Sequence, residues 1–277
     1  MDVNSIDCND PQALSNAAEA MVWFHSIDLG HGVVTKGCKT PALLNKELNA
    51  LQLPDLRGRT VLDIGAYDGF YSFEAERRGA SRVVSMDLHV WQLETSLTES
   101  YLAQCAANGT VPTPPYRTEW MQWRLDAERM PGKMRFDLAR RALNSRVEPV
   151  IQDFMTADPA VIGTFDVVLF LGVLYHTQYP LAALQRVFTL TKHMVVIETE
   201  AMEIPAAPDT ALCEFFPSNE LNGDYSNWWS PNLQALMGLL RAAGFKRIEV
   251  IQGPPPAALL KTGEPLIRYR AMVHAFK

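Results

Sequence analysis

The residues that most clearly suggest a ligand-binding function form the turn Asp63-Ile64-Gly65-Ala66-Tyr67-Asp68-Gly69. It follows the short apolar segment Val61 to Ile64 and precedes a helical pattern from about Phe70 to Arg78. A strand, a glycine turn and a helix together bring backbone N–H groups and a helix N-terminus to a ligand. The turn differs from the GxGxxG pattern of dinucleotide sites, and Asp68 would repel a pyrophosphate. The turn therefore predicts a ligand group that is positively charged.

Two further carboxylates end the strands that we expect next in the chain. Asp87, followed by Leu88, ends the segment Arg82 to Asp87, and a carboxylate there can accept protons from both hydroxyls of a ribose. Asp153 follows a strand over residues 147–151. There it could accept a hydrogen bond from an adenine amine while Phe154 packs on the ring.

These carboxylates match the parts of one molecule when they are taken in order. S-adenosylmethionine carries an ammonium group, a ribose and an adenine. A strand-end Asp is common in any α/β protein, so each carboxylate alone is a weak signal. The ordered set predicts S-adenosylmethionine as the cofactor, with S-adenosylhomocysteine as its product. The remaining candidates for cofactor binding are Gly65, Ala66, Tyr67, Gly69, Leu88, Leu171 and Gly172.

Two histidines are candidates for catalysis. Methyl transfer from a sulfonium requires mainly that acceptor, methyl group and sulfur are aligned, and a base helps when the acceptor is a phenol, alcohol or amine. His176 follows the fourth strand, where acceptor and methyl group should meet, and histidine titrates near neutral pH. Alternatively, Tyr175 and His176 shape the pocket floor by hydrogen bonds. His25 could reach the pocket from an N-terminal lid, or lie at a helix end on the surface.

Aromatic and acidic residues supply the candidates for binding the acceptor. Tyr175, Trp228, Trp229 and Trp23 could contact a planar acceptor, although tryptophans also pack in cores. Trp120 and Trp123 stand at helical spacing with Met121, which is more typical of a core. Glu198 and Glu200 end the fifth strand, where they either touch an acceptor or cap the segment that follows.

Strands and helices alternate along most of the chain, which predicts an α/β fold with a mostly parallel sheet. Two segments, 88–146 and 199–231, are too long for simple connections, and we expect them to cover the acceptor pocket. The expected strands are 61–64, 82–87, 147–151, 165–171, 194–198, 247–251 and 269–276, and the expected helices are 11–26, 40–51, 70–78, 180–191 and 232–243.

Composition narrows the class of protein. The 277 residues carry a formal net charge of −6, which disfavours general binding to nucleic acid. One segment, 117–146, has eight Lys and Arg against four Asp and Glu, and is either a solvated helix face or a phosphate-binding surface. The four cysteines lie far apart without a CxxC pair, so we expect neither a disulfide framework nor a metal site. No membrane span or signal peptide is evident, and we expect a cytoplasmic protein.

The motifs also resemble those of a known family. The turn at 63–69, Asp87, Asp153 and the string Gly172-Val173-Leu174-Tyr175-His176 look like the successive motifs of class I methyltransferases. Pro180-Leu181, Glu198-Thr199 and the segment Trp228-Trp229-Ser230-Pro231-Asn232 resemble more narrowly the tRNA wobble-uridine carboxymethyltransferase family, which uses carboxy-S-adenosylmethionine. Shorter relatives often begin with a Trp-x-His-x-Ile-x-Leu string, as Trp23 to Leu29 does here.

The resemblance covers about residues 58–252 and implies a Rossmann-like class I methyltransferase fold with a seven-stranded sheet. We expect a helical N-terminal lid over residues 1–57 and a methyltransferase domain over 58–277. Only Lys36 and Lys39 are candidates for holding a carboxylated cofactor, and no motif anchors them. The expected reaction is therefore methyl transfer to O or N of a small-molecule metabolite. The alternatives are a tRNA uridine-modifying enzyme and a non-catalytic regulator that binds the cofactor.

Overall fold

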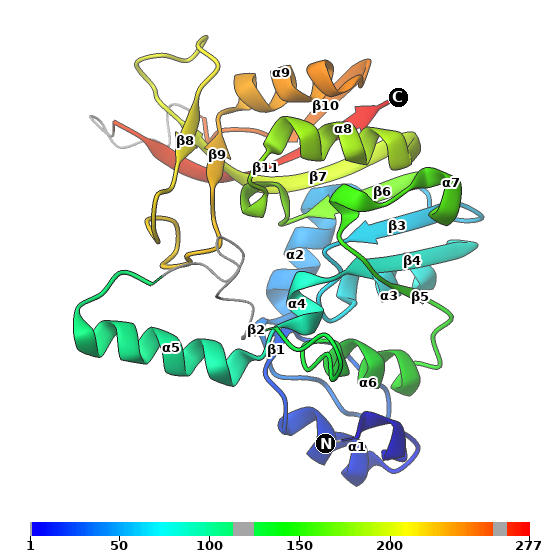
Figure 1. The fold of residues 1–277 in the computed structure, drawn as a ribbon. Coiled ribbons are helices and arrows are strands. Elements are labelled where there is room, and N and C mark those ends of the chain that lie inside the picture. Colours follow the sequence, from blue (N-terminus) through cyan, green and yellow to red (C-terminus); the bar gives the residue numbers. More distant parts are fainter. Residues whose placement is uncertain (1, 113–124, 257–264) are drawn as a thin grey trace. The chain divides into compact units, whose positions relative to one another are not determined.

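The computed structural model describes residues 2–112, 125–256 and 265–277. Helices and strands alternate along the chain, as the coloured ribbon shows (Figure 1). The chain forms two compact units. Unit 1 comprises Met1–Ser100 and Trp123–Asp153, and unit 2 comprises Tyr101–Gln122 and Phe154–Lys277. The predicted basic segment and the predicted core residues Trp120, Met121 and Trp123 lie wholly or partly outside the described residues.

Unit 1 contains three parallel strands of the main sheet, in the order β3-β4-β5. In the register of these strands Ile64 pairs with Met86, and Asp87 pairs with Ile151. The carboxyl ends of the three strands therefore lie side by side, as the sequence predicts. The elements of unit 1 are η1 Val3–Ser5, α1 Pro11–Glu19, β1 Trp23–His25, β2 Gly37–Lys39, α2 Pro41–Leu51, β3 Thr60–Ile64, α3 Phe70–Arg77, β4 Arg82–Asp87, α4 His89–Gln92, α6 Met134–Ala142 and β5 Glu148–Ile151. Helix α5 (Thr95–Asn108) spans the end of this segment and the start of unit 2.

The glycine turn between β3 and α3 depends on backbone conformations that favour glycine. Gly69 has φ of 90°, and a Cβ built there would lie 2.6 Å from the ring of Phe73 and 2.7 Å from that of Phe136. Any side chain at this position would collide with the rings that pack below α3. Tyr67 also has a positive φ, 53°, which is uncommon for a residue with a bulky side chain. The turn therefore requires glycine at position 69 and holds Tyr67 in a sparsely populated backbone conformation.

The first expected helix, 11–26, is wrong in its second half. Helix α1 begins with an Asp10 cap and ends at Glu19, and Trp23–His25 form strand β1 instead. This strand pairs in parallel with β2, and Asp68 accepts hydrogen bonds from the backbone N–H groups of Phe24 and His25. These partners satisfy the backbone outside a helix, so tertiary contacts override the apolar spacing of the sequence. The expected N-terminal lid thus contains two short strands as well as helices.

Unit 2 contains the other four strands of the main sheet, in the order β6-β7-β11-β10. Strands β6 and β7 are parallel, whereas β11 pairs antiparallel with both β7 and β10. Helices α8 and α9 pack against each other beside β7 (Figure 1). The elements of unit 2 after α5 are η3 Phe154–Thr156, α7 Pro159–Ile162, β6 Phe165–Leu171, η4 Leu174–His176, α8 Pro180–Leu190, β7 Thr191–Glu203, β8 Cys213–Phe215, β9 Trp229–Pro231, α9 Leu233–Ala243, β10 Arg247–Gln252 and β11 Ile267–Phe276.

The fifth expected strand is longer than its sequence pattern indicates. Strand β7 continues to Glu203, because residues as far as Glu203 pair with β11. The second expected insert therefore starts inside the sheet, and its far end forms a small antiparallel ladder of β8 and β9. Apart from these changes, the expected α/β class and the seven-stranded, mostly parallel sheet are confirmed.

Two features are absent from the part of the chain that the structure describes. No helix there combines the length and apolar character needed to cross a membrane. No group of three or more His, Cys, Asp or Glu residues is arranged there to hold a metal ion.

Candidate functional site

Unit 1 gathers three buried acidic residues, Asp63, Asp68 and Asp87, which we call the carboxylate cluster. Asp63 lies near the end of β3 and accepts a hydrogen bond of 2.5 Å from the Ser72 hydroxyl. Burial raises the pKa of Asp63 to about 6, and the nearby charges of Asp87 and Asp68 add to this rise, while Ser72 and His25 oppose it. A cation bound at this cluster would relieve the repulsion among its members.

Asp87 connects the glycine turn to the following helix. Its carboxylate accepts hydrogen bonds from the backbone N–H groups of Tyr67, at 3.0 Å, and Val90, at 3.1 Å. The indole N–H of Trp91 donates to the carbonyl of Tyr67 at 2.7 Å. Burial raises the pKa of Asp87, although these backbone hydrogen bonds oppose the rise. Each carboxylate oxygen has a second lone pair, so the side chain retains acceptor capacity for a ligand hydroxyl.

Asp68 and His25 form a buried pair. His25 Nδ1 lies 2.5 Å from Asp68 Oδ1, and the His25 backbone N–H donates to Asp68 Oδ2 at 2.8 Å. The imidazole stacks on Phe70 at a centroid distance of 5.3 Å. No hydrogen bond to His25 Nε2 is found among the described residues. The carboxylate thus orients the ring so that Nε2 is the nitrogen able to act on a ligand.

The other predicted cofactor residues of unit 1 follow the strand ends. Leu88 is half-buried directly after β4. Asp153 is partly exposed after β5, with its carboxylate 3.9 Å from His89 Nε2. The backbone N–H of Gln152 donates to the carbonyl of Asp87 at 3.2 Å, which holds these two strand ends together. Asp63, Asp87 and Asp153 therefore stand at adjacent strand ends, as the sequence predicts.

In unit 2, His176 belongs to a chain of hydrogen bonds that we call the histidine relay: Asp224, Ser226 and His176. The Ser226 hydroxyl donates to Asp224 at 2.8 Å and lies 2.9 Å from His176 Nδ1. If the hydroxyl proton points to Asp224, Nδ1 carries the imidazole proton and Nε2 is the basic nitrogen. Burial lowers the pKa of His176, which Asp224 partly offsets. The imidazole is therefore neutral at pH 7.

An ion-pair network lies beside the relay. Arg270 on β11 is opposite Glu200 on β7, and its guanidinium binds both Glu198 and Glu200. It also lies 5.0 Å from the centre of the Tyr175 ring. Burial alone would lower the pKa of Arg270, but the bonds to Glu198 and the charge of Glu200 raise it, so the group stays charged. Burial raises the pKa of the Tyr175 hydroxyl.

The predicted acceptor residues of unit 2 lie close together. The backbone N–H of Trp228 donates to the carbonyl of Tyr175 at 2.8 Å, and the Trp229 indole donates to the carbonyl of Gln178 at 3.1 Å. Both tryptophans are half-buried, and Phe215 packs against them. The segment before α9 and the end of β6 thus meet within unit 2.

The predicted cofactor residues of unit 2 surround the end of β6. Phe154 meets Phe170 edge to face at 5.4 Å. Leu171 is half-buried, and the N–H of Gly172 donates to the carbonyl of Glu198 at 2.9 Å. Gly172 has φ of 71°, a conformation that glycine adopts without strain.

Some candidates lie elsewhere. Trp23 is 1% exposed and donates its indole N–H to the carbonyl of Ala18, so its side chain packs in the core of unit 1. Lys36 pairs with Glu19 on the surface, and Lys39 is bound to Glu47 at 2.8 Å. Neither lysine is available without breaking an existing ion pair.

Sequence reasoning missed Ser226, Asp224 and Arg270. Ser226 and Asp224 lie in a loop without a motif, about fifty positions from His176. One feature of the sequence could have pointed to Arg270, because it is a charged residue within a strand in which polar and apolar residues alternate. Only the strand register places it opposite Glu200.

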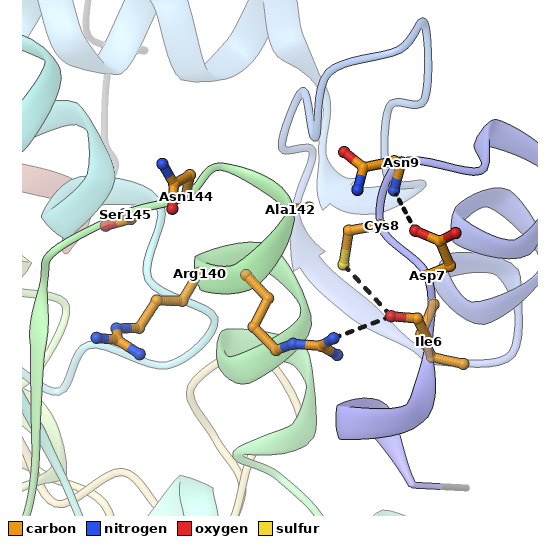
Figure 2. Close-up of a pocket in the computed structure, with 9 residues that line it drawn as sticks. Ile6, Asp7, Cys8, Asn9, Arg140, Ala142, Asn144 and Ser145 are labelled. Carbon is orange, nitrogen blue, oxygen red and sulfur yellow. Dashed lines mark hydrogen bonds between the residues drawn. The ribbon is translucent and has the colours of Figure 1, made fainter.

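A surface pocket of about 620 Å³ in unit 1 contains none of the predicted site residues. Figure 2 shows Ile6, Cys8 and Asn9 on one side of it and Arg140 and Asn144 on the other. Arg141, on α6, donates to the carbonyls of Val3 and Ile6 and fastens the N-terminal segment to the helix.

Comparison with known proteins finds relatives of low sequence identity. The tRNA U34 carboxymethyltransferase of Psychrobacter cryohalolentis is 25% identical over 207 residues, which are 73% of this chain and 47% of that protein. That of Helicobacter pylori strain J99 is 30% identical over 101 residues, 36% of each chain. The matched segments span half or less of these relatives.

One solved structure shares the fold over most of the chain. The N-terminal domain of EvdMO1, crystallised in the presence of SAH and D-fucose, has a TM-score of 0.58 and 16% identity, and the match covers 96% of this chain and 95% of that one. The same domain with SAH bound has a TM-score of 0.57. Both matches show that this chain shares the fold of that domain.

The family model described as a methyltransferase domain matches residues 39–250. That match includes the glycine turn, the three strand-end carboxylates and His176. Because it covers well over half of the sequence, the chain belongs to this family of methyltransferase enzymes.

Proposed function

We propose that this protein transfers a methyl group from S-adenosylmethionine to an oxygen or nitrogen atom of a small molecule, with His176 as the general base. The observation that carries the proposal is the histidine relay, because it leaves a neutral base with a defined basic nitrogen. A base of this kind is useful for a hydroxyl or amine acceptor and unnecessary for mere binding of a cofactor.

The residues of unit 1 fit the cofactor. The carboxylate cluster suits its ammonium group, since all three acidic side chains are buried and the pKa of Asp63 is raised by burial and, to a smaller degree, by the charges of Asp87 and Asp68. Asp87 retains acceptor capacity for ribose hydroxyls, and Asp153 is partly exposed at the next strand end. When bound, the cofactor supplies a methyl group on a positively charged sulfur, which is an electrophile without further activation.

The residues of this chain then have three tasks. The carboxylate cluster and the glycine turn fix the position of the cofactor. Trp228 and Trp229 hold a planar or apolar part of the acceptor. His176 Nε2 accepts the proton that the acceptor loses, and Asp224 stabilises the resulting imidazolium through Ser226. His25, oriented by Asp68, is the second candidate for the base.

The described basic residues favour a small acceptor over tRNA. Within 125–146, Arg129 binds Asp126, Lys133 binds Asp137 and Arg146 is near Glu76. Arg135, Arg140 and Arg141 donate to backbone carbonyls, and Arg135 is buried. Cations that are already paired contribute little to phosphate binding. The D-fucose present with the EvdMO1 domain makes a hydroxylated small molecule a reasonable first class of acceptor to test.

The test has two stages. Mass spectrometry of the ligand that copurifies, followed by calorimetry with S-adenosylhomocysteine, examines the cofactor and distinguishes the plain from the carboxylated form. Turnover is then measured on a panel of sugars, phenols and amines, with unmodified tRNA as a separate arm at low and high salt.

Methylation of a small molecule is the expected result. Turnover on tRNA with salt-sensitive binding would replace the proposal by the RNA-modifying alternative. Cofactor binding without turnover on any arm would favour a regulator, and failure to bind the cofactor would reject the proposal altogether.

A further inference from the structure

Arg135, in the first turn of α6, is a buried cation without a carboxylate partner. It is 6% exposed, and no acidic oxygen among the described residues lies within ion-pair distance of it. Burial of an unpaired guanidinium is unfavourable, because the charge loses its hydration without gaining a counter-charge. A protein retains such a group when another molecule supplies the negative charge or when backbone carbonyls compensate in part.

Backbone carbonyls satisfy only part of this guanidinium. Nε donates to the carbonyl of Gly132 at 3.2 Å, and Nη1 donates to the carbonyl of Val22 at 2.8 Å. Nη2 has no partner among the described residues. Nor is it one of the buried polar atoms that are sealed from solvent without a partner. This nitrogen therefore borders space that water or a ligand can enter.

Other cations of unit 1 have carboxylate or backbone partners, or lie away from the glycine turn. Lys133 is bound to Asp137 at 2.5 Å, and Lys39 to Glu47 at 2.8 Å. Arg141 binds two backbone carbonyls beside the surface pocket, away from the glycine turn. Arg135 is thus buried, and its Nη2 still has N–H groups without a partner among the described residues.

The guanidinium lies next to the glycine turn. Its central carbon is 5.3 Å from the centre of the Tyr67 ring. Burial raises the pKa of the Tyr67 hydroxyl, the charge of Arg135 opposes this rise, and the charges of Asp68 and Asp87 add to it. The positive group and the carboxylate cluster therefore act on the same side chain, the one at the middle of the turn.

A series of contacts fixes Arg135 in this place. The Trp91 indole donates to the carbonyl of Tyr67, and the carbonyl of Trp91 accepts the N–H of Gly132, three residues before Arg135. A Cβ at Gly132 would lie 1.8 Å from the carbonyl oxygen of Val90, so only glycine permits this approach. The start of α6 is therefore held directly beside the turn.

A cation opposite a group of carboxylates is complementary to a zwitterion. The amino-acid end of S-adenosylmethionine carries one ammonium and one carboxylate on the same carbon. We propose that Arg135 binds the α-carboxylate of the cofactor, while the carboxylate cluster binds its ammonium group. The segment 88–146 then contributes to the cofactor site in addition to any role as a cover. This assignment depends on the proposed function, because it requires that cofactor.

The experiment compares S-adenosylmethionine with decarboxylated S-adenosylmethionine, which lacks only the α-carboxylate. Calorimetry on the full chain measures both affinities for the wild type, Arg135→Gln and Arg135→Lys. We expect the wild type to prefer S-adenosylmethionine by about 10- to 100-fold, as is typical of a hydrogen-bonded charge pair. Arg135→Gln should lose that preference while its affinity for the decarboxylated compound stays unchanged. Arg135→Lys should restore part of the preference.

The matched control is Arg141→Gln. This variant also removes an α6 arginine that binds backbone carbonyls, so it reports on the loss of a structural link. It should keep the full preference of the wild type. Equal weakening of both ligands in Arg135→Gln would mean that Arg135 only fastens α6 to Val22, and would overturn the inference. A wild type that binds neither ligand would instead reject the proposed function.

Discussion

In unit 1 the acidic side chains of the candidate site are held mainly by backbone N–H groups, whereas in unit 2 they are held mainly by other side chains. Asp87 binds the backbone of Tyr67 and Val90, and Asp68 binds the backbone of Phe24 and His25. In unit 2, Glu198 and Glu200 bind Arg270.

This difference has a chemical consequence. Backbone donors cannot lose their protons, so the backbone hydrogen bonds of Asp68 and Asp87 hold their acceptor atoms in place, which suits recognition of a cofactor. Side-chain partners such as Ser226 and His176 can pass and accept protons, which suits catalysis. The comparison predicts that changes in unit 1 alter binding and that changes in unit 2 alter turnover.

The largest expected effect is that of His176→Ala. Loss of a general base should lower turnover by about 1,000-fold, while affinity for S-adenosylhomocysteine stays within about twofold. Steady-state kinetics and calorimetry on the same preparation measure the two quantities. His193→Ala, which removes an exposed histidine of unit 2, should change neither. Parallel losses of binding and turnover would mean that His176 has a structural role.

Asp87→Ala should weaken binding of S-adenosylhomocysteine by about 100-fold, because it removes a charged acceptor and frees the backbone N–H groups of Tyr67 and Val90. Calorimetry measures this loss. Asp55→Ala, which removes an exposed carboxylate of the same unit, is the control and should leave affinity unaltered. Unchanged affinity in Asp87→Ala would show that the ribose assignment is wrong.

Asp63→Asn should stabilise the ligand-free protein in a pH-dependent way. The folded-state pKa of Asp63 is raised to about 6 from 3.8, so its favourable contribution is complete below about pH 3.8 and is lost as pH rises through 6. The variant does not titrate, and its advantage should grow between pH 4 and 7 to about 3 kcal/mol and then level off. Urea unfolding at several pH values measures this difference.

Asp55→Asn is the comparison for that series. The Arg57 hydrogen bond lowers the pKa of Asp55 to about 2, so its contribution is lost only in strong acid. The stability difference between this variant and the wild type should therefore be flat from pH 4 to 8. A slope equal to that of Asp63→Asn would contradict the assignment of the titration to buried Asp63.

The smallest expected effect is that of Asp224→Asn. Burial lowers the pKa of His176 below 6.5, so wild-type turnover should rise with pH through that pKa and be flat above it. Asp224 opposes this lowering, and its removal should move the acidic limb of the profile to still lower pH. Turnover at pH 8 should change little, because His176 is neutral in both proteins. A pH–rate profile that does not move would remove Asp224 from the relay.

The turn at 63–69 and the strand-end positions of Asp87 and Asp153 were predictable because each is encoded within one strand–turn–helix unit. Apolar runs that end in glycine or acidic residues define such units locally. The helix expected over 11–26 failed for the opposite reason. Its last residues, Trp23 to His25, are extended because strand β2 and Asp68 bind their backbone.

The sequence by itself determined the α/β class, the glycine turn and the carboxylates at successive strand ends, since these follow from short-range patterns. Only the tertiary structure decided that Ser226 and Asp224 orient His176, that Arg270 lies opposite Glu200, and that Arg135 stands beside Tyr67. The physical reason is distance along the chain. Contacts between residues fifty or more positions apart depend on strand register and loop packing, which leave no periodic pattern in the amino-acid sequence.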